Sequence, residues 1–182
     1  MKDHIMISGF ADEIDSDFTK QLDTVTKLGM HYISLRSADK KGIADYTCRE
    51  VEELLLPRLN QYGVKVSSIG SPIGKVGIED EEGFQKQKQQ LEELCKICKL
   101  LDCRYIRMFS FFIPEGKDPE NYREAVIEKL TQFLEIASAH GVILLHENEK
   151  EIYGDTGARC KVLFEALGSE YFRAAFDFAN FV

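Results

Sequence analysis

The sequence of 182 residues lacks tryptophan, long apolar runs and clusters of basic residues, and it contains only four prolines and four histidines. A membrane-spanning helix needs about 20 consecutive apolar residues, so we expect no membrane anchor. The 23 Lys and Arg residues are outnumbered by 31 Asp and Glu residues, which gives a net charge of −8. Because nucleic acids and anionic membranes attract basic surfaces, this balance disfavours both as partners.

The cysteines form no recognisable disulfide or zinc pattern. There are five of them at irregular spacing, so we expect reduced thiols and a cytoplasmic location. Cys95 and Cys98 form one C-x-x-C pair inside a helical pattern, without the second pair that a zinc site needs. We interpret them as packing residues on a helix face. No signal peptide is recognisable, because the polar residues Met1–His4 lead directly into a short apolar segment.

One unit recurs along the chain: an apolar strand, a polar loop, an amphipathic helix and a glycine. The predicted strands are apolar on both faces, as in a parallel sheet that is covered on both sides. They span Ile5–Phe10, Tyr32–Arg36, Val64–Ile69, Tyr105–Phe109, Val142–Glu147 and Arg173–Phe178. The predicted helices span Asp17–Leu28, Arg49–Tyr62, Glu81–Leu101, Pro119–His140 and Ala158–Leu167. This alternation indicates right-handed βαβ units and an α/β fold.

Residues at the predicted boundaries support these elements. Thr47 and Glu50 have the spacing of a capping box at a helix start. Four glycines stand where a helix must end in a left-handed residue before the next strand. They are Gly29, Gly63, Gly141 and Gly168.

A parallel sheet of this kind is either an open doubly wound sheet or a (β/α) barrel. The first strand–helix loop, Gly9–Asp15, lacks a G-x-G-x-x-G motif and carries three carboxylates where a pyrophosphate needs bare amides. The loop Gly70–Gly77 is glycine-rich but lacks Walker A spacing, and we interpret it as a mobile loop over a pocket. Both loops disfavour a nucleotide-binding open sheet.

Polar residues at the carboxyl ends of the strands are the candidate site, because both the open doubly wound sheet and the barrel bind ligands there. Glu147 and Asp177 end neighbouring predicted strands 30 residues apart, so we expect them side by side. Two converging carboxylates repel unless a proton or a cation lies between them, and a divalent metal with oxygen ligands relieves that repulsion. The alternative is that both are solvated loop carboxylates.

Other strand-end residues have competing interpretations. His146 has the opposite strand parity to Glu147, so we expect a hydrogen-bonded structural histidine that faces the helices. Arg36 and Arg107 could bind an anionic substrate or pair with nearby acidic residues. Aromatic side chains at strand ends, including Phe10 and Phe109, could form the floor of a sugar pocket.

Four segments together resemble one known family. They are Gly9–Glu13, Tyr32–Arg36, His146–Glu149 and Phe176–Asn180. The pattern resembles the xylose isomerase-like TIM-barrel family, which is also labelled sugar phosphate isomerase/epimerase. In that family a divalent metal (manganese, magnesium, zinc or cobalt) is held by a Glu, an Asp, a His and a Glu at the ends of strands five to eight.

The resemblance implies site residues in this chain. Glu147 and Asp177 match the first two metal ligands, and Glu147 would also act as the catalytic acid–base group. We assign substrate contacts to Phe10, Arg36, Arg107, Phe109, Lys150 and Asn180. Ser34 stands where the family often has Glu, and Asn180 stands where it usually has His. These departures disfavour a multinuclear centre and leave single-metal sugar chemistry possible.

The length predicts an incomplete barrel. An eight-stranded barrel typically takes about 250 residues, and six strands are predicted here. We therefore expect one domain over residues 1–182, a C-terminally incomplete (β/α)8 TIM barrel with about six parallel strands and five to six helices. Because the open sheet edges need cover, we expect a homo-oligomer or a further C-terminal segment.

The implied function is a divalent-metal-dependent sugar or sugar phosphate isomerase or epimerase that transfers a proton next to a carbonyl. Without the ligands of strands seven and eight, we expect this chain alone to bind metal weakly or not at all and to turn over little substrate. One alternative is a non-catalytic sugar-binding or degenerate barrel protein. Another is an abasic-site endonuclease, which the charge of −8 disfavours.

Overall fold

The computed structural model describes residues 5–181. Its main sheet has five parallel strands in the order β1-β4-β5-β6-β7. They are β1 (Tyr32–Leu35), β4 (Lys65–Gly70), β5 (Tyr105–Met108), β6 (Ile143–Glu147) and β7 (Phe172–Ala175). A short antiparallel pair, β2 (Ser37–Ala38) and β3 (Lys41–Gly42), follows β1. The spatial order equals the chain order, which is the order of a barrel wall and not of a doubly wound sheet.

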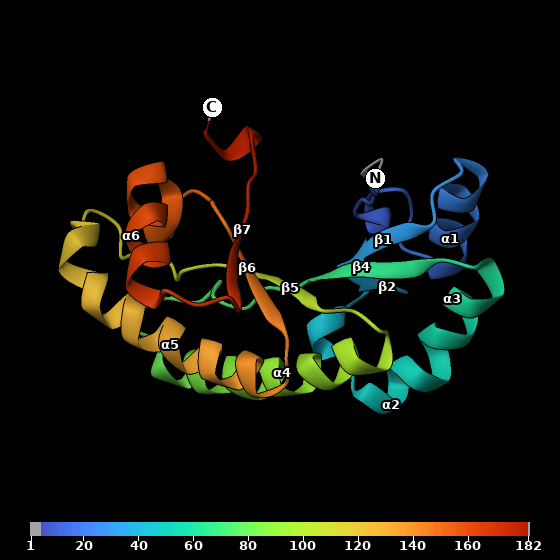
Figure 1. The fold of residues 1–182 in the computed structure, drawn as a ribbon, viewed down its shortest axis with the longest axis horizontal. Coiled ribbons are helices and arrows are strands. Elements are labelled where there is room, and N and C mark those ends of the chain that lie inside the picture. The colour runs from blue at the N-terminus through green and yellow to red at the C-terminus, as the bar shows by residue number, and fades with distance from the viewer. Residues whose placement is uncertain (1–4, 182) are drawn as a thin grey trace.

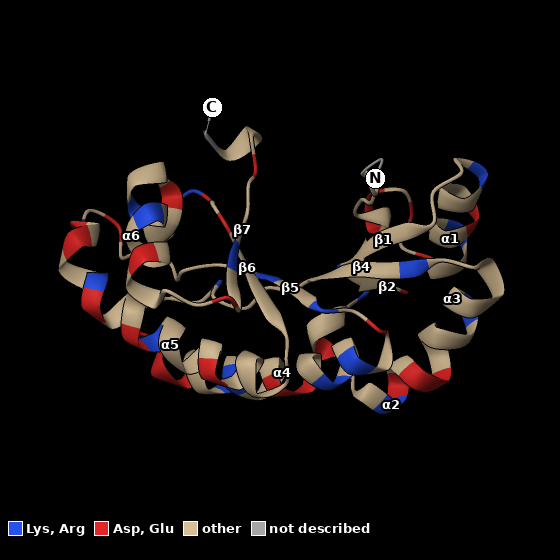
Figure 2. Cartoon of the chain, in the orientation of Figure 1, with Lys and Arg blue, Asp and Glu red and all other residues tan. Residues whose placement is uncertain are grey.

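Helices cover the outer side of this sheet and give the molecule the shape of an open arc (Figure 1). They are α1 (Phe18–Lys27), α2 (Cys48–Glu50), α3 (Leu56–Tyr62), α4 (Glu81–Leu100), α5 (Arg123–Ala139) and α6 (Gly157–Leu167). Acidic and basic residues alternate along these outer helices (Figure 2). Within residues 5–181, no helix has the length and apolar character that crossing a bilayer requires.

The predicted helix Arg49–Tyr62 is interrupted by a π-helical turn. Val51–Leu55 adopts this wider turn between α2 and α3. Pro57, at the start of α3, has no N–H, and its ring would clash with the carbonyl group four residues earlier in a regular α-helix. The wide turn accommodates the proline without ending the helix.

The prediction of a first strand over Ile5–Phe10 is wrong for the described residues. Only Phe10 bridges to β1, through a parallel pair with Ser34, and Ser34 N donates to Gly9 O over 2.9 Å. Ile5 and Ile7 are 90% and 70% exposed. A strand needs a backbone partner along its length, and this segment has one point of contact. The barrel wall therefore has five regular strands in place of the predicted six.

The core lies between the sheet and the helices. Strand residues such as Ile33, Leu35, Ile106 and Leu144 face it, since their side chains are almost completely buried. Cys95 and Cys98 of α4 are also buried in this core, which agrees with their interpretation as packing residues. Because side chains alternate along a strand, the residues between these positions face the inner side of the arc. The candidate site lies on that inner face.

Candidate functional site

The strand register brings several polar residues to one level of the inner face. Gly70, the last residue of β4, pairs with Arg107 of β5. Leu35 of β1 pairs with Ile69, so Arg36 follows at the level of Gly70. Arg107 in turn pairs with Leu145 of β6, two residues before Glu147. The carboxyl ends of these strands thus gather the predicted site residues.

Three cations (Arg36, Arg107 and Lys75) and two aromatic rings (Phe10 and Phe109) alternate there, and we call these five residues the cation–aromatic row. The guanidinium carbon of Arg36 lies 4.5 Å from the centre of the Phe10 ring. That of Arg107 lies 5.2 Å from the Phe10 ring and 4.7 Å from the Phe109 ring. The ammonium of Lys75 lies 4.2 Å from the Phe109 ring. Each of these distances is short enough for cation–π attraction.

A cavity of about 400 Å³ opens beside this row. Its lining includes Arg36, Lys75, Arg107, Phe109, Asp12 and Ser71. Lys75 was missed by sequence reasoning, although it lies in the loop that was predicted to cover a pocket. That loop is held by its backbone: Phe109 N donates to Ile73 O over 2.8 Å, and Phe111 N donates to Gly74 O over 2.9 Å.

Two of the three cations have close acidic partners. Arg36 Nε lies 2.8 Å from Asp12 Oδ2 and Arg36 Nη2 lies 3.2 Å from Glu13 Oε1, and the bond to Asp12 is the main cause that raises the pKa of Arg36. Lys75 Nζ lies 3.1 Å from Glu149 Oε2. Of the two interpretations open for Arg36, the structure shows pairing with acidic neighbours.

Arg107 has weaker partners. Its side chain is 11% exposed, and its Nη1 lies 3.6 Å from Glu147 Oε1. Its Nε has no hydrogen-bond acceptor among residues 5–181. Burial lowers the pKa of Arg107, and Glu147 opposes that shift. A guanidinium with so few bonds is free to receive another partner.

Glu147 ends β6 and pairs with Ala175 of β7, two residues before Asp177, and the side-by-side placement of the two carboxylates stays a prediction. Burial is the main cause that raises the pKa of Glu147, and the negative charge of Asp177 raises it further, against the opposing effects of Arg107 and Lys75. The Glu147 side chain is 15% exposed. Asp177 follows β7, which ends at Ala175 and not at Phe178 as predicted.

Asn148 fixes the position of Asp177. Its Nδ2 donates to Asp177 O over 2.9 Å, and its Oδ1 accepts from Asp177 N over 2.9 Å. Asn180 Nδ2 also donates to Asn148 O, over 2.8 Å. The side-chain amide of Asn180, which we predicted to contact substrate, thus holds the loop after β7 in this structure. Sequence reasoning missed Asn148, because only the register shows that it faces the loop after β7. Lys150 is exposed and does not line the cavity beside the row.

His146 faces the helices, as its strand parity predicts. It is 1% exposed, and its ring lies 6.3 Å from that of Phe164 in α6. Its Nε2 lies 2.9 Å from Ser110 Oγ, which also accepts a bond from Gly154 N. Burial lowers the pKa of His146 to about 4. This histidine is neutral at physiological pH and belongs to the packing of the barrel wall.

The donor set fits part of a metal site. Glu147 and Asp177 supply carboxylate oxygens, which Mg²⁺ and Mn²⁺ prefer. The raised pKa of Glu147 reflects in part a repulsion from Asp177 that a cation would relieve. Among residues 5–181, no group of three or more His, Cys, Asp or Glu residues could hold a metal ion. Glu147 and Asp177 therefore stay predicted ligands.

Comparison with known proteins places the chain in a family. The sequence profile described as xylose isomerase-like TIM barrel matches residues 22–182. No curated protein sequence matches the chain. Among solved structures, a D-tagatose 3-epimerase-like protein superposes with a TM-score of 0.77 at 15% identity, over 96% of this chain and 66% of that one.

Two further solved structures contain metals. The IolI protein with a bound zinc atom superposes with a TM-score of 0.76 at 17% identity, over 97% of this chain and 64% of that one. A xylose isomerase-like TIM barrel protein from Mycobacterium smegmatis, in complex with magnesium, superposes with a TM-score of 0.72 at 15% identity, over 95% and 63%. The chain therefore spans less than two thirds of the length of these two structures.

Proposed function

The chain belongs to the xylose isomerase-like TIM-barrel family, and from this premise we propose that it forms part of the active site of a divalent-metal-dependent sugar or sugar phosphate isomerase or epimerase. The observation that carries the proposal is the pair Glu147 and Asp177 at the ends of neighbouring strands. Glu147 is mostly buried, has a raised pKa and lies 3.6 Å from Arg107, which lines the cavity. These are the properties of a carboxylate that exchanges protons with a bound substrate.

Glu147 is the acid–base group of this proposal. A bound divalent cation, held by Glu147 and Asp177, would polarise the substrate carbonyl and acidify the neighbouring C–H bond. Glu147 would accept that proton and return it to the substrate. Arg107, 3.6 Å from Glu147, stabilises the ionised form between the two steps.

The remaining residues position the sugar. The rings of Phe10 and Phe109 offer apolar surface for its C–H groups. Asn148 and Asn180 hold the loop that carries Asp177. An epimerase also needs an acid–base group on the opposite face of the sugar, and we assign none among residues 5–181. We therefore propose one-sided proton exchange for the chain by itself.

Deuterium exchange tests this function. The chain is incubated in D₂O with Mn²⁺ and a ketose (D-fructose, D-tagatose or D-ribulose 5-phosphate), and NMR follows the loss of the proton next to the carbonyl. We expect slow exchange without inversion, and Glu147→Gln should reduce it at least about 100-fold, the usual contribution of a general base. Glu151→Gln, a control at an exposed glutamate of the same loop, should leave the exchange rate unchanged.

The competing function is a sugar-binding barrel without catalysis. The observation in its favour is that no group of three or more potential metal ligands comes together among the described residues. Saturable sugar binding with no deuterium exchange at any pH, or exchange that persists in Glu147→Gln, would contradict the proposed isomerase or epimerase.

A further inference from the structure

The two outer cations of the cation–aromatic row each have a carboxylate within hydrogen-bond distance, and the central cation has none. Arg36 is paired with Asp12 at 2.8 Å, and Lys75 is paired with Glu149 at 3.1 Å. The pair of Arg36 has the length of a charge-assisted hydrogen bond, and that of Lys75 is within ordinary hydrogen-bond distance. Arg107, between the two rings, has no hydrogen-bonded carboxylate, because its nearest charged partner lies 3.6 Å away. The central cation of the row thus has only the longer ion pair with Glu147.

Arg107 is one of the residues that line the cavity, and its side chain is 11% exposed. The rings of Phe10 and Phe109 both lie within cation–π distance of the group. Its Nε has no acceptor in the part of the chain that the structure describes, although it is buried. A guanidinium carries five N–H donors in a planar fork, and a buried donor without an acceptor is unfavourable. The fork fits the two oxygens of a carboxylate.

Gly70 keeps room for this arrangement. A Cβ atom at this position would lie 2.7 Å from a carbon of the Phe10 ring and 3.3 Å from Arg107 Nη2. Any side chain at Gly70 would therefore clash with the Phe10 ring and crowd the Arg107 guanidinium. A position without a side chain lets the ring and the guanidinium approach the backbone of β4.

We infer that Arg107 binds one carboxylate group of the substrate, which makes the substrate a sugar acid. This inference rests on the proposed function and names the substrate class of the same site. The guanidinium carries one positive charge, and its ion pair with Glu147, at 3.6 Å, is too long for a hydrogen bond and leaves its donors available to a ligand. A phosphate, at −1.5 to −2, would place more negative charge beside Glu147 than one carboxylate does, and a neutral sugar would give the guanidinium no charged hydrogen-bond acceptor.

Calorimetric titration with three matched compounds tests the inference. D-glucuronate, D-glucose and D-glucose 6-phosphate share one ring and differ at carbon 6, which carries a carboxylate, a hydroxyl or a phosphate. We expect the chain to bind D-glucuronate at least about tenfold more tightly than D-glucose, as a charge-assisted bond requires. D-glucose 6-phosphate should bind more weakly than D-glucuronate. Equal affinity for all three compounds, or preference for the phosphate, would overturn the inference.

Variants of Arg107 test whether this residue causes the preference for D-glucuronate. Arg107→Gln should remove the preference for D-glucuronate over D-glucose, and Arg107→Lys should retain only part of it, because an ammonium lacks the planar fork. Arg58→Gln is the matched control. Arg58 also lies over a phenylalanine ring, that of Phe18 at 5.1 Å, and pairs with Asp39 outside the cavity. A loss of preference in Arg58→Gln as large as in Arg107→Gln would contradict a carboxylate site at Arg107.

The two proposals fail in different ways. Deuterium exchange into a neutral ketose by a chain that does not prefer D-glucuronate refutes the carboxylate site and leaves the isomerase or epimerase standing. Preferential binding of D-glucuronate without exchange in any compound supports the carboxylate site and contradicts the proposed catalysis.

Discussion

Gly74 shows how closely the backbone approaches at the mouth of the site. Its φ is +84°, and a Cβ atom there would lie 2.0 Å from Phe109 O. We expect Gly74→Ala to lower the free energy of unfolding by more than about 3 kcal/mol, because backbone strain and a clash add together. Gly116→Ala is the control: φ is +73° and nothing lies within 4 Å of its Cβ position, so about 1 kcal/mol is expected. Equal losses in the free energy of unfolding for the two variants, measured by urea unfolding, would contradict the close approach of Gly74 to Phe109.

The buried His146 makes stability depend on pH. Its pKa falls from an ordinary value of 6.5 in the unfolded chain to about 4 in the fold. Between these values the unfolded state binds more protons, so the free energy of unfolding decreases as pH falls from 6.5 to 4. The full effect is about 3 kcal/mol. Urea unfolding of the chain and of His146→Gln across this range should show a flatter pH profile for the variant, and parallel profiles would refute the effect.

The orientation and the partners of individual side chains could be predicted only in part. Strand parity correctly oriented His146 towards the helices, because side-chain direction alternates along any strand. The partner of Arg36 stayed open, since a sequence does not show which acidic residues fold back onto it. Lys75 joins the row through a hydrogen-bonded loop, and loops have no periodicity from which such a contact can be read.

At the scale of elements, the capping box of α2 provides a measurable local contribution. Thr47 Oγ1 accepts from Glu50 N over 3.2 Å, and Glu50 Oε2 accepts from Thr47 N over 2.8 Å. Thr47→Ala should lower the free energy of unfolding by about 1 kcal/mol, since it leaves a helix N–H without its partner. Thr47→Ser keeps the hydroxyl and should cost less. Equal losses for the two variants in urea unfolding would contradict the cap.

Helices were better predicted than strands. The predicted helix Asp17–Leu28 begins and ends within one residue of α1, because its cap and its final glycine are local signals. Strand ends depend on partners far away in the chain. The segment Ile5–Phe10 and the end of β7 have too few neighbours to extend as predicted. The π-helical turn before Pro57 was not expected, because a proline within a helical segment can also be accommodated by a kink or by the end of the helix.

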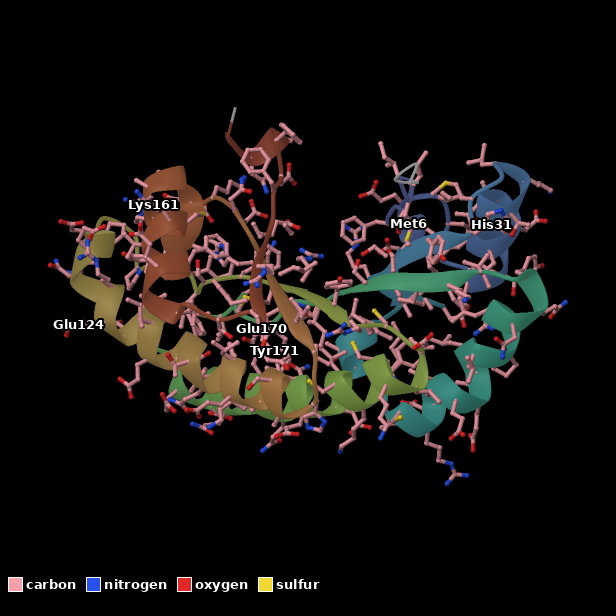
Figure 3. All side chains as sticks on the ribbon, viewed as in Figure 1. Met6, His31, Glu124, Lys161, Glu170 and Tyr171 are labelled. Carbon is pink, nitrogen blue, oxygen red and sulfur yellow. The ribbon has the colours of Figure 1, made fainter. Side chains whose placement is uncertain are left out.

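At the scale of the whole molecule, both ends of the arc expose apolar side chains. Ile5 and Ile7 lie beside β1, and Phe178, which follows β7, is 81% exposed. Figure 3 shows Met6 and His31 on the β1 side of the arc, far from Lys161 on the α6 side. Exposed sheet edges with apolar residues favour association. We therefore propose that copies of this chain associate through these ends.

Light scattering at increasing concentration tests this association. We expect the mean mass to rise with concentration, and Ile7→Lys or Phe178→Lys to reduce the rise, because a charge disfavours burial of the edge. Leu54→Lys, at a residue that is 51% exposed on the outer helices, should have no effect. A constant monomer mass at all concentrations would refute association through the sheet ends.

In the proposed site, Glu147 and Asp177, on neighbouring strand ends, share a divalent cation. The most direct test is a titration with Mn²⁺ followed by electron paramagnetic resonance, which needs no substrate. The unmodified chain should bind one Mn²⁺ weakly, and Glu147→Gln and Asp177→Asn should each weaken this binding at least about tenfold, because each removes an oxygen ligand. Glu151→Gln should leave it unchanged. Equal Mn²⁺ affinity in the unmodified chain and in both site variants would contradict the account.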